Sequence, residues 1–203
     1  MPDDATSRQH SERPAVFLDR DGVLIEDIDL LTKREEVRLL PGVSQALQML
    51  QQSGYLLIVV SNQTVISRGL ATEAEVGKIN QHIQDLIEKS GGPRLDAFYV
   101  CPHHPKATLP AYRTICDCRK PEPGLFLRAA REHCIDLKRS FTVGDRITDI
   151  IAGYKSGGRT ILVETGRHMD APIETATPLD SSIKADAVCA SLADAAEWIL
   201  RNR

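Results

Sequence analysis

The sequence predicts an α/β fold: a doubly wound, mainly parallel sheet with helices on both faces. Short apolar runs rich in β-branched residues alternate with segments in which apolar residues recur at helical spacing. The run at 55–62, YLLIVVSN, is continuously apolar for most of its length, which is typical of a strand buried on both faces. Strands and helices that alternate at this spacing favour parallel strands joined by right-handed crossovers.

The individual elements follow from local signals. Gly54 ends the first helical segment, Thr72 and Glu75 form a predicted capping box, and Pro123 precedes another helix. We expect strands at 15–18, 55–62, 96–101, 140–145, 160–165 and 185–188, and helices at 43–54, 72–90, 123–134 and 192–201.

Composition limits the function classes. A net charge of −3 and the lack of a long apolar run argue against nucleic acid and membrane partners. Five cysteines, an odd number, do not suggest a disulfide framework, so we expect a cytoplasmic protein. Residues 1–13 are polar and aperiodic, which predicts a disordered leader before a single domain over 14–203. We expect this domain to be a monomer without a large cap domain.

Polar side chains gather where the predicted strands end. In an open α/β sheet, ligands bind outside the carboxyl ends of the strands. Any one of these groups alone commonly serves as a turn or a helix cap, but four of them at one sheet edge indicate a site. The groups are Asp19-Arg20-Asp21-Gly22, Ser61-Asn62-Gln63, Gly144-Asp145-Arg146 with Asp149 behind it, and Arg119-Lys120 before a helix.

These residue types suit phosphoryl transfer. Asp19 and Asp21 are two positions apart and project to the same side of an extended segment. With Asp145 they form a carboxylate cluster whose repulsion a cation would relieve, and Mg²⁺ prefers carboxylate oxygens together with substrate phosphate. Ser61 and Lys120 supply a neutral donor and a positive charge for the remaining phosphoryl oxygens.

The motifs DRDGV, SNQ, RKPEPG and GDRITD, in this order, resemble the four motifs of the haloacid dehalogenase (HAD) superfamily phosphatases. The resemblance covers roughly residues 14–166. It implies that Asp19 is the nucleophile and that Asp21 is the general acid and base, with its main-chain carbonyl on Mg²⁺. It further implies that Ser61 and Lys120 stabilise the phosphoryl group and that Asp145 is a metal ligand, with Asp149 either behind the metal or linked to it through water.

The segment at 101–118 contains a second candidate metal site. Cys101 and His103 precede Cys116 and Cys118, and two such close pairs suit a closed, tetrahedral, structural Zn²⁺ site. Local sequence does not choose between His103 and His104, and the family resemblance favours His103. A zinc ion here would staple a loop that ends directly at Lys120. The other reading is a loop of free cysteines with an incidental histidine.

The zinc loop together with FLDRDGV resembles the subgroup that contains the heptose 1,7-bisphosphate 7-phosphatases and the histidinol-phosphate phosphatases. The resemblance implies a small sugar phosphate as substrate, first a heptose 1,7-bisphosphate, with histidinol phosphate or another small phosphorylated metabolite as the alternative. The chain departs from the subgroup at residues 27–30, and at 64–65 where Ser-Gly is usual. Candidate substrate contacts are Asn62, Gln63, Arg119, Arg146, Asp27 and Leu30.

Two readings outside the enzymes use some of the same residues. A receiver module phosphorylated on aspartate also combines an aspartate, Mg²⁺, Ser or Thr and Lys at strand tips. Asp21 argues against a receiver, because an acid two residues after the nucleophile has little use where the phosphoryl group must persist. A zinc-stabilised binding protein without catalysis is the other reading, and it would not need Asp19.

Overall fold

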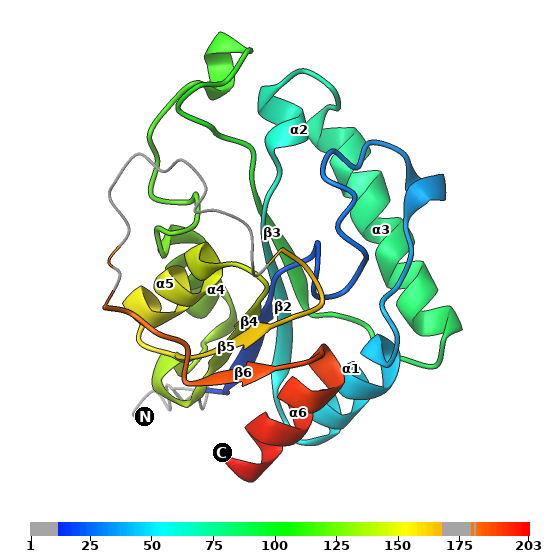
Figure 1. The fold of residues 1–203 in the computed structure, drawn as a ribbon, viewed down its shortest axis with the longest axis vertical. Coiled ribbons are helices and arrows are strands. Elements are labelled where there is room, and N and C mark those ends of the chain that lie inside the picture. Colours follow the sequence, from blue (N-terminus) through cyan, green and yellow to red (C-terminus); the bar gives the residue numbers. More distant parts are fainter. Residues whose placement is uncertain (1–11, 168–179, 181) are drawn as a thin grey trace, which may run out of the picture.

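The structure is a computed structural model that describes residues 12–167, 180 and 182–203. Its centre is one six-stranded sheet in the order β3-β2-β1-β4-β5-β6, and every neighbouring pair of strands is parallel (Figure 1). The predicted fold class is therefore confirmed. The strands are β1 (Ala15–Leu18), β2 (Leu56–Asn62), β3 (Ala97–Cys101), β4 (Phe141–Gly144), β5 (Arg159–Val163) and β6 (Ala187–Cys189).

Helices cover both faces of the sheet. One face packs against α1 (Val43–Gln52), α3 (Glu73–Lys89) and α6 (Leu192–Arg201), and the other against α4 (Gly124–His133) and α5 (Ile147–Ser156). Four short helices lie in connections: α2 (Thr64–Ser67), η1 (Arg34–Glu36), η2 (Pro110–Tyr112) and η3 (Leu137–Arg139). Among the residues that the structure describes, no helix is long and apolar enough to cross a membrane.

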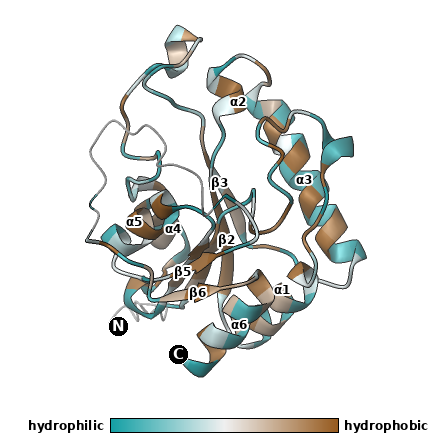
Figure 2. Cartoon of the chain, viewed as in Figure 1, coloured by the Kyte–Doolittle hydropathy of each residue, from teal (hydrophilic) through white to brown (hydrophobic). Residues whose placement is uncertain are grey.

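The two-residue repeat of β1 divides the core. Val16 and Leu18 belong to the cluster under α1, α3 and α6, whereas Phe17 faces α4. The rings of Phe17 and Phe126 lie 5.0 Å apart between centroids. Figure 2 shows brown along the strands of the sheet and bands of brown and teal along the helices that cover it. Because both faces are covered, the aspartates of the predicted site lie past the ends of the strands, in the loops that leave the sheet.

The strand order creates the site. β1 leads to β2 and β3 on one side, whereas β4, β5 and β6 continue on the other, so the chain reverses direction across the sheet between β1 and β4. The Asp19 N–H donates to the Val143 carbonyl oxygen (2.9 Å), which extends this pairing past the end of β1. Loops leaving β1 and β4 therefore diverge and leave a crevice at a topological switch point.

The sequence prediction differs from the structure in a few places. No helix was assigned to 147–156 or 64–67, where α5 and α2 form, and β6 begins two residues later than expected. Most of the predicted leader lies outside the described residues. Its last residue, Arg13, is already part of the fold, because its N–H donates to the Cys134 carbonyl oxygen (3.0 Å).

The capping box of α3 gives a test of the fold. The Thr72 hydroxyl accepts from the Glu75 N–H (3.2 Å), and the Glu75 carboxylate accepts from the Thr72 N–H (2.7 Å). We expect Thr72→Ala to lower the free energy of unfolding by about 1 kcal/mol in urea titrations. Glu75→Gln should cost less, because glutamine can keep the reciprocal hydrogen bond. Equal stability of Thr72→Ala and the unchanged protein would contradict this account.

Candidate active site

Lys120 lies at the centre of the polar cluster between β1, β2 and β4. Its ammonium Nζ is 2.7 Å from Asp19 Oδ1 and 2.5 Å from Asp149 Oδ1, and it donates to the Val60 carbonyl oxygen at 2.7 Å. The side chain is only 4 % exposed. Burial disfavours the charged form, but the two carboxylates outweigh it and raise the pKa of Lys120. Lys120 is thus a fixed positive charge.

Asn62 fixes the backbone of Lys120. Its side-chain Nδ2 donates to the Lys120 carbonyl oxygen, and its Oδ1 accepts from the Lys120 N–H, each at 3.1 Å. Both polar groups of that backbone unit are therefore tied to the end of β2. Asn62 was predicted as a substrate contact, and the structure shows that its amide is engaged in holding Lys120, while the residue also lines the cavity described below.

The carboxylates of Asp19, Asp145 and Asp149 converge, with one oxygen of each within 4.8 Å of the others. Asp145 is fully buried. Its Oδ2 accepts from the Arg167 N–H (2.7 Å), whereas its Oδ1 has no hydrogen-bond partner among the described residues. Burial, followed by the negative charges of Asp19 and Asp149, raises the pKa of Asp145 to about 8. Burial likewise raises the pKa of Asp19 to about 6, although Lys120 opposes the shift.

This cluster fits a divalent cation. A buried carboxylate oxygen without a partner is costly unless a cation or a donor meets it. When all are ionised, three carboxylates and the Lys120 ammonium carry a net charge of −2. Gly22 has a φ of +79°, and a Cβ there would lie 2.5 Å from Asp145 Oδ2. Only glycine suits that position, so the turn after β1 can approach Asp145 closely.

Asp21 is held by a separate network. Its carboxylate accepts two hydrogen bonds from the Arg20 guanidinium, each at 3.0 Å, and one from Gln63 Nε2 at 2.8 Å. The same Gln63 nitrogen also donates to Ser61 Oγ at 2.8 Å. The predicted residues Asp21, Ser61 and Gln63 are therefore brought together. Sequence analysis gave no role to Arg20, although a charged residue inside an otherwise buried turn is itself a signal.

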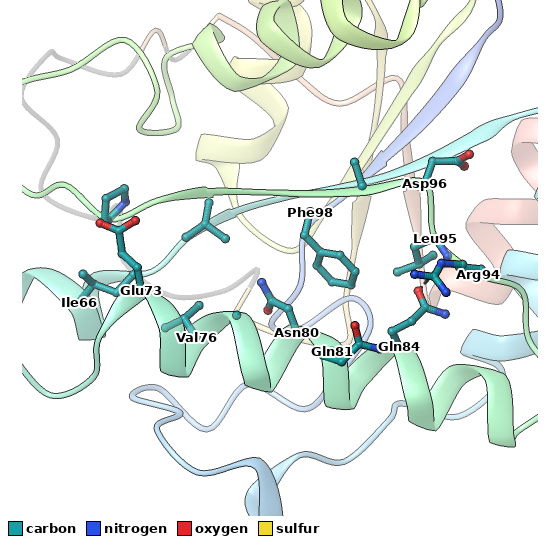
Figure 3. Close-up of a pocket in the computed structure, with 14 residues that line it drawn as sticks. Ile66, Glu73, Val76, Asn80, Gln81, Gln84, Arg94, Leu95, Asp96 and Phe98 are labelled. Carbon is teal, nitrogen blue, oxygen red and sulfur yellow. Dashed lines mark hydrogen bonds between the residues drawn. The ribbon is translucent and has the colours of Figure 1, made fainter.

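A cavity of about 210 Å³ opens beside these side chains. A larger one of about 410 Å³ lies between α3 and β3 (Figure 3), but Asp19, Asp149 and Lys120 line only the smaller cavity. The smaller cavity also has a cationic wall, formed by Arg68, Arg119, Arg146 and Arg167. Sequence analysis named Arg119 and Arg146 but not Arg68 or Arg167, which belong to no recognised motif.

Asp27 connects two of these arginines. Its carboxylate, whose side chain is 8 % exposed, accepts from Arg146 Nη2 at 3.1 Å and lies 3.0 Å from Arg167 Nε. Asp27 thus aligns cations at the cavity. Leu30, also predicted as a substrate contact, is placed differently: it packs against the apolar cluster of Val65 and its neighbours and is not among the residues lining the cavity.

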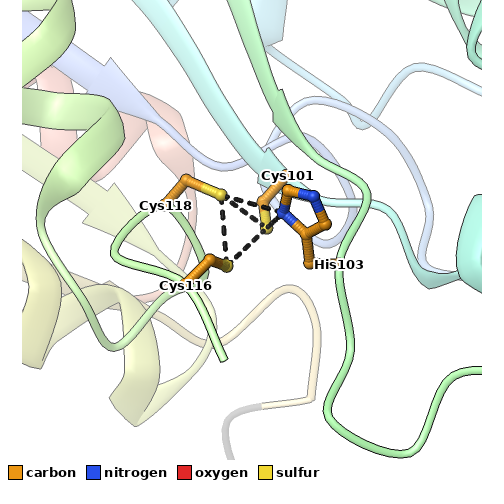
Figure 4. A group of neighbouring side chains, drawn as sticks. All are labelled: Cys101, His103, Cys116 and Cys118. Carbon is orange, nitrogen blue, oxygen red and sulfur yellow. Dashed lines mark hydrogen bonds between the residues drawn. The ribbon is translucent and has the colours of Figure 1, made fainter. Parts of the chain in front are cut away.

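The second metal-site candidate is assembled as its spacing predicts. Cys101, His103, Cys116 and Cys118 converge, and the ring nitrogen of His103 points at the three sulfurs (Figure 4). Sulfur–sulfur distances are 3.1–3.7 Å, and His103 Nδ1 lies 3.3 Å from Cys118 Sγ. A tetrahedral ion with bonds of about 2.3 Å to sulfur needs sulfur atoms about 3.8 Å apart. The four groups could therefore hold a metal ion with a small expansion.

Comparison with known proteins gives consistent results. A family model described as HAD-hydrolase-like matches residues 117–195. The D-glycero-β-D-manno-heptose-1,7-bisphosphate 7-phosphatase of Photorhabdus laumondii is 38 % identical over 85 % of this chain and 92 % of its own length. The protein of the same name from Escherichia coli K12 is 36 % identical over 94 % of this chain and 95 % of its own length.

A solved structure agrees with these relatives. The D,D-heptose 1,7-bisphosphate phosphatase of B. bronchiseptica, complexed with magnesium and phosphate, superposes with a TM-score of 0.77 at 32 % identity. The match covers 94 % of this chain and 99 % of that one. The fold and the site define a phosphatase of the HAD-like class. Within that class, the chain belongs to the family of the heptose-bisphosphate phosphatases.

The raised carboxyl pKa values predict a pH-dependent stability. Asp19 and Asp145 titrate in the folded protein at about 6 and about 8, against a usual value of 3.8. At a pH between the usual value and the raised pKa of each group, the folded state binds more protons than the unfolded chain. The free energy of unfolding therefore falls as pH rises. Without added Mg²⁺, we expect the midpoint of urea unfolding to decrease from about pH 5 to about pH 8.

Asp145→Asn should remove most of this pH dependence, because asparagine does not titrate. Adding Mg²⁺ at the upper end of the range should restore the lost stability by binding the ionised cluster. A urea midpoint of the metal-free protein that stays constant or rises over this pH range would contradict the raised pKa values of Asp19 and Asp145.

Proposed function

We propose that this phosphatase removes the 7-phosphate of D-glycero-β-D-manno-heptose 1,7-bisphosphate through an aspartyl-phosphate on Asp19, with Mg²⁺ as cofactor. The observation that supports this best is the buried group of Asp19, Lys120, Asp145 and Asp149 at the switch point of the sheet. Relatives that match most of the chain carry the name of this activity. We further propose a cytoplasmic monomer as the active unit.

In the first step, an Asp19 carboxylate oxygen attacks phosphorus and forms an oxygen–phosphorus bond. The bond between phosphorus and the sugar oxygen breaks, and Asp21 donates a proton to that departing oxygen. Lys120, held by Asn62 and buried beside Asp19, stabilises the negative charge of the phosphoryl oxygens. Ser61, at the end of β2, donates a further hydrogen bond to the same group.

In the second step, Asp21 takes a proton from water, and the water oxygen attacks phosphorus. The bond to Asp19 breaks, which releases inorganic phosphate and restores both aspartates. One carboxyl group can serve both steps because the proton it gives in the first is replaced in the second. A covalent intermediate divides one difficult displacement into two easier ones.

The carboxylates of Asp19 and Asp145 and the main-chain carbonyl of Asp21 would hold Mg²⁺, which neutralises charge on the phosphoryl oxygens when bound. Asp145 Oδ1, which has no hydrogen-bond partner in the part of the chain that the structure describes, supports this ligand set. The direct ion pair of Asp149 with Lys120 supports a role in fixing the lysine.

Cys101, His103, Cys116 and Cys118 would hold a structural Zn²⁺, since their four ligand atoms complete a tetrahedron and leave no position for water. Arg119 follows this loop directly, and its Nη1 donates to the His103 carbonyl oxygen at 3.1 Å. The zinc would thus support the segment that presents Arg119 and Lys120 to the cavity.

The cationic wall supports a substrate with two phosphates. Arg119 and Arg146 would bind the phosphate that is not transferred, while Gln63 and Asp27 orient the groups around it. Histidinol phosphate carries one phosphate and would leave Arg119 and Arg146 without a second anion to bind.

A phosphate-release assay on the purified protein tests the reaction. Asp19→Asn should lower kcat with the heptose bisphosphate by about 10³-fold or more, because the amide is not a nucleophile. Asp85→Asn on α3, which does not line the cavity beside Asp19, is the matched control and should retain full activity. The heptose bisphosphate should have a higher kcat/KM than histidinol phosphate. Full activity in Asp19→Asn would refute the nucleophile role of Asp19. A higher kcat/KM for histidinol phosphate than for the heptose bisphosphate would refute the proposed substrate.

Removing zinc tests the loop. Metal analysis should find one zinc per chain, and a zinc-selective chelator should lower the melting temperature and abolish activity, because the loop that carries Lys120 loses its support. Cys116→Ala should have a similar effect, whereas Cys134→Ala should not, because Cys134 is exposed and outside the cluster. Unchanged thermal stability after chelation would rule out the structural zinc.

A further inference from the structure

Arg20 is an unusual residue in this fold. It lies between the two aspartates of the first motif, yet it is only 1 % exposed. Among the described residues, it is the largest side chain that is fully buried. Burying a guanidinium costs several kcal/mol, and an apolar side chain of similar size often serves stability as well. A buried arginine that makes specific hydrogen bonds therefore calls for a role other than stability.

The Arg20 guanidinium donates hydrogen bonds to three side chains. Nε and Nη2 donate to the two carboxylate oxygens of Asp21, each at 3.0 Å. Nη2 also donates to Gln63 Oε1 at 2.8 Å, and Nη1 donates to Asn80 Oδ1 at 3.2 Å. Gln63 closes a ring by donating to Asp21 Oδ2 at 2.8 Å. The Asp21 carboxyl is therefore held from two sides.

Asn80 anchors this arrangement from outside the cavity of the reaction. It projects from α3 toward the sheet and lines the separate cavity between α3 and β3 (Figure 3). Asn80 is absent from the lining of the cavity beside Asp19. The hydrogen bond from Arg20 therefore links Asn80 to the groups beside that cavity.

We propose that Arg20 is a positioning residue for Asp21: anchored by Asn80 and Gln63, it holds the Asp21 carboxyl in the orientation needed for proton transfer. The inference rests on the proton-transfer role that we propose for Asp21. A bidentate guanidinium restricts both the position and the plane of a carboxyl group. A lysine at position 20 would keep the charge but lose the planar fork.

Kinetics of Arg20→Lys and Asn80→Ala test the proposal. General acid–base catalysis typically supplies about 10²- to 10⁴-fold, so partial misplacement of Asp21 in Arg20→Lys should lower kcat about 10- to 100-fold with KM changed by less than about threefold. Asn80→Ala should lower kcat by less, about 3- to 10-fold, since the pair with Asp21 remains. The substrate is the heptose bisphosphate.

A second substrate, p-nitrophenyl phosphate, separates positioning from a general loss of structure. Its leaving group departs without a donated proton, whereas water attack on the aspartyl-phosphate still needs Asp21 as base. Both variants should therefore show a burst of nitrophenolate equal to the enzyme concentration, followed by slow turnover. A merely structural role would reduce the amount of folded enzyme and produce no burst.

Two further variants complete the design. Arg128→Lys, on the exposed face of α4, makes the same chemical change away from the site and should keep the parent kinetics. Asp21→Asn tests the role on which the inference rests, and full activity in that variant would refute that part of the proposed function. A different result would refute only the positioning role of Arg20. In that case Asp21→Asn would be inactive, whereas Arg20→Lys and Asn80→Ala would both fold and keep the kcat of the parent protein. Should Arg20→Lys fail to fold, Asn80→Ala decides.

Discussion

The charge arrangement at the junction of β1 and β4 is the constraint on which the site depends. Asp19, Asp145 and Asp149 crowd around Lys120, nearly out of contact with water. Burial is the main cause of the raised pKa values of Asp19 and Asp145, and the negative charge of their neighbours adds to it. One ammonium cannot balance three carboxylates, which leaves the cluster with a deficit of positive charge. A divalent cation removes it. In the proposed reaction, the neutralised site would attract a phosphate dianion on one side and keep the Asp19 carboxylate ionised as the nucleophile on the other.

The rest of the molecule serves to hold these charges in place. Strand order puts Asp19 beside Asp145 although they lie far apart in the sequence. Asn62 ties the Lys120 backbone to the end of β2, and the Cys/His cluster closes the loop that precedes it. Arg20 holds the Asp21 carboxylate by two hydrogen bonds, as Asn62 holds the Lys120 backbone by two. Each group of the proposed reaction thus has at least one partner that fixes its orientation, which is how rigid sites limit the cost of reorganisation.

Much of this architecture was accessible from the sequence, because its signals are local. The apolar runs of β1 and β2, the capping box of α3 and the order of the four motifs each depend on a few neighbouring residues. The helix α5 was missed because its buried positions, such as Ile150 and Ala152, follow the conspicuous Gly144-Asp145 turn directly. Contacts between distant segments were the other gap. Neither the Arg20–Asn80 hydrogen bond nor the pairing of Asp27 with Arg167 leaves a pattern in one sequence.

The claim at the centre of this account is that Asp19 becomes covalently phosphorylated while a divalent ion and Lys120 hold the transferred group. A crystal structure of the protein with Mg²⁺ and beryllium fluoride tests it most directly, because this phosphoryl mimic bonds to a nucleophilic carboxylate. We predict beryllium bonded to an Asp19 carboxylate oxygen, a fluoride beside Lys120 Nζ, and Mg²⁺ on Asp145. Beryllium fluoride bound to another residue, or Mg²⁺ bound away from Asp145, would contradict the account.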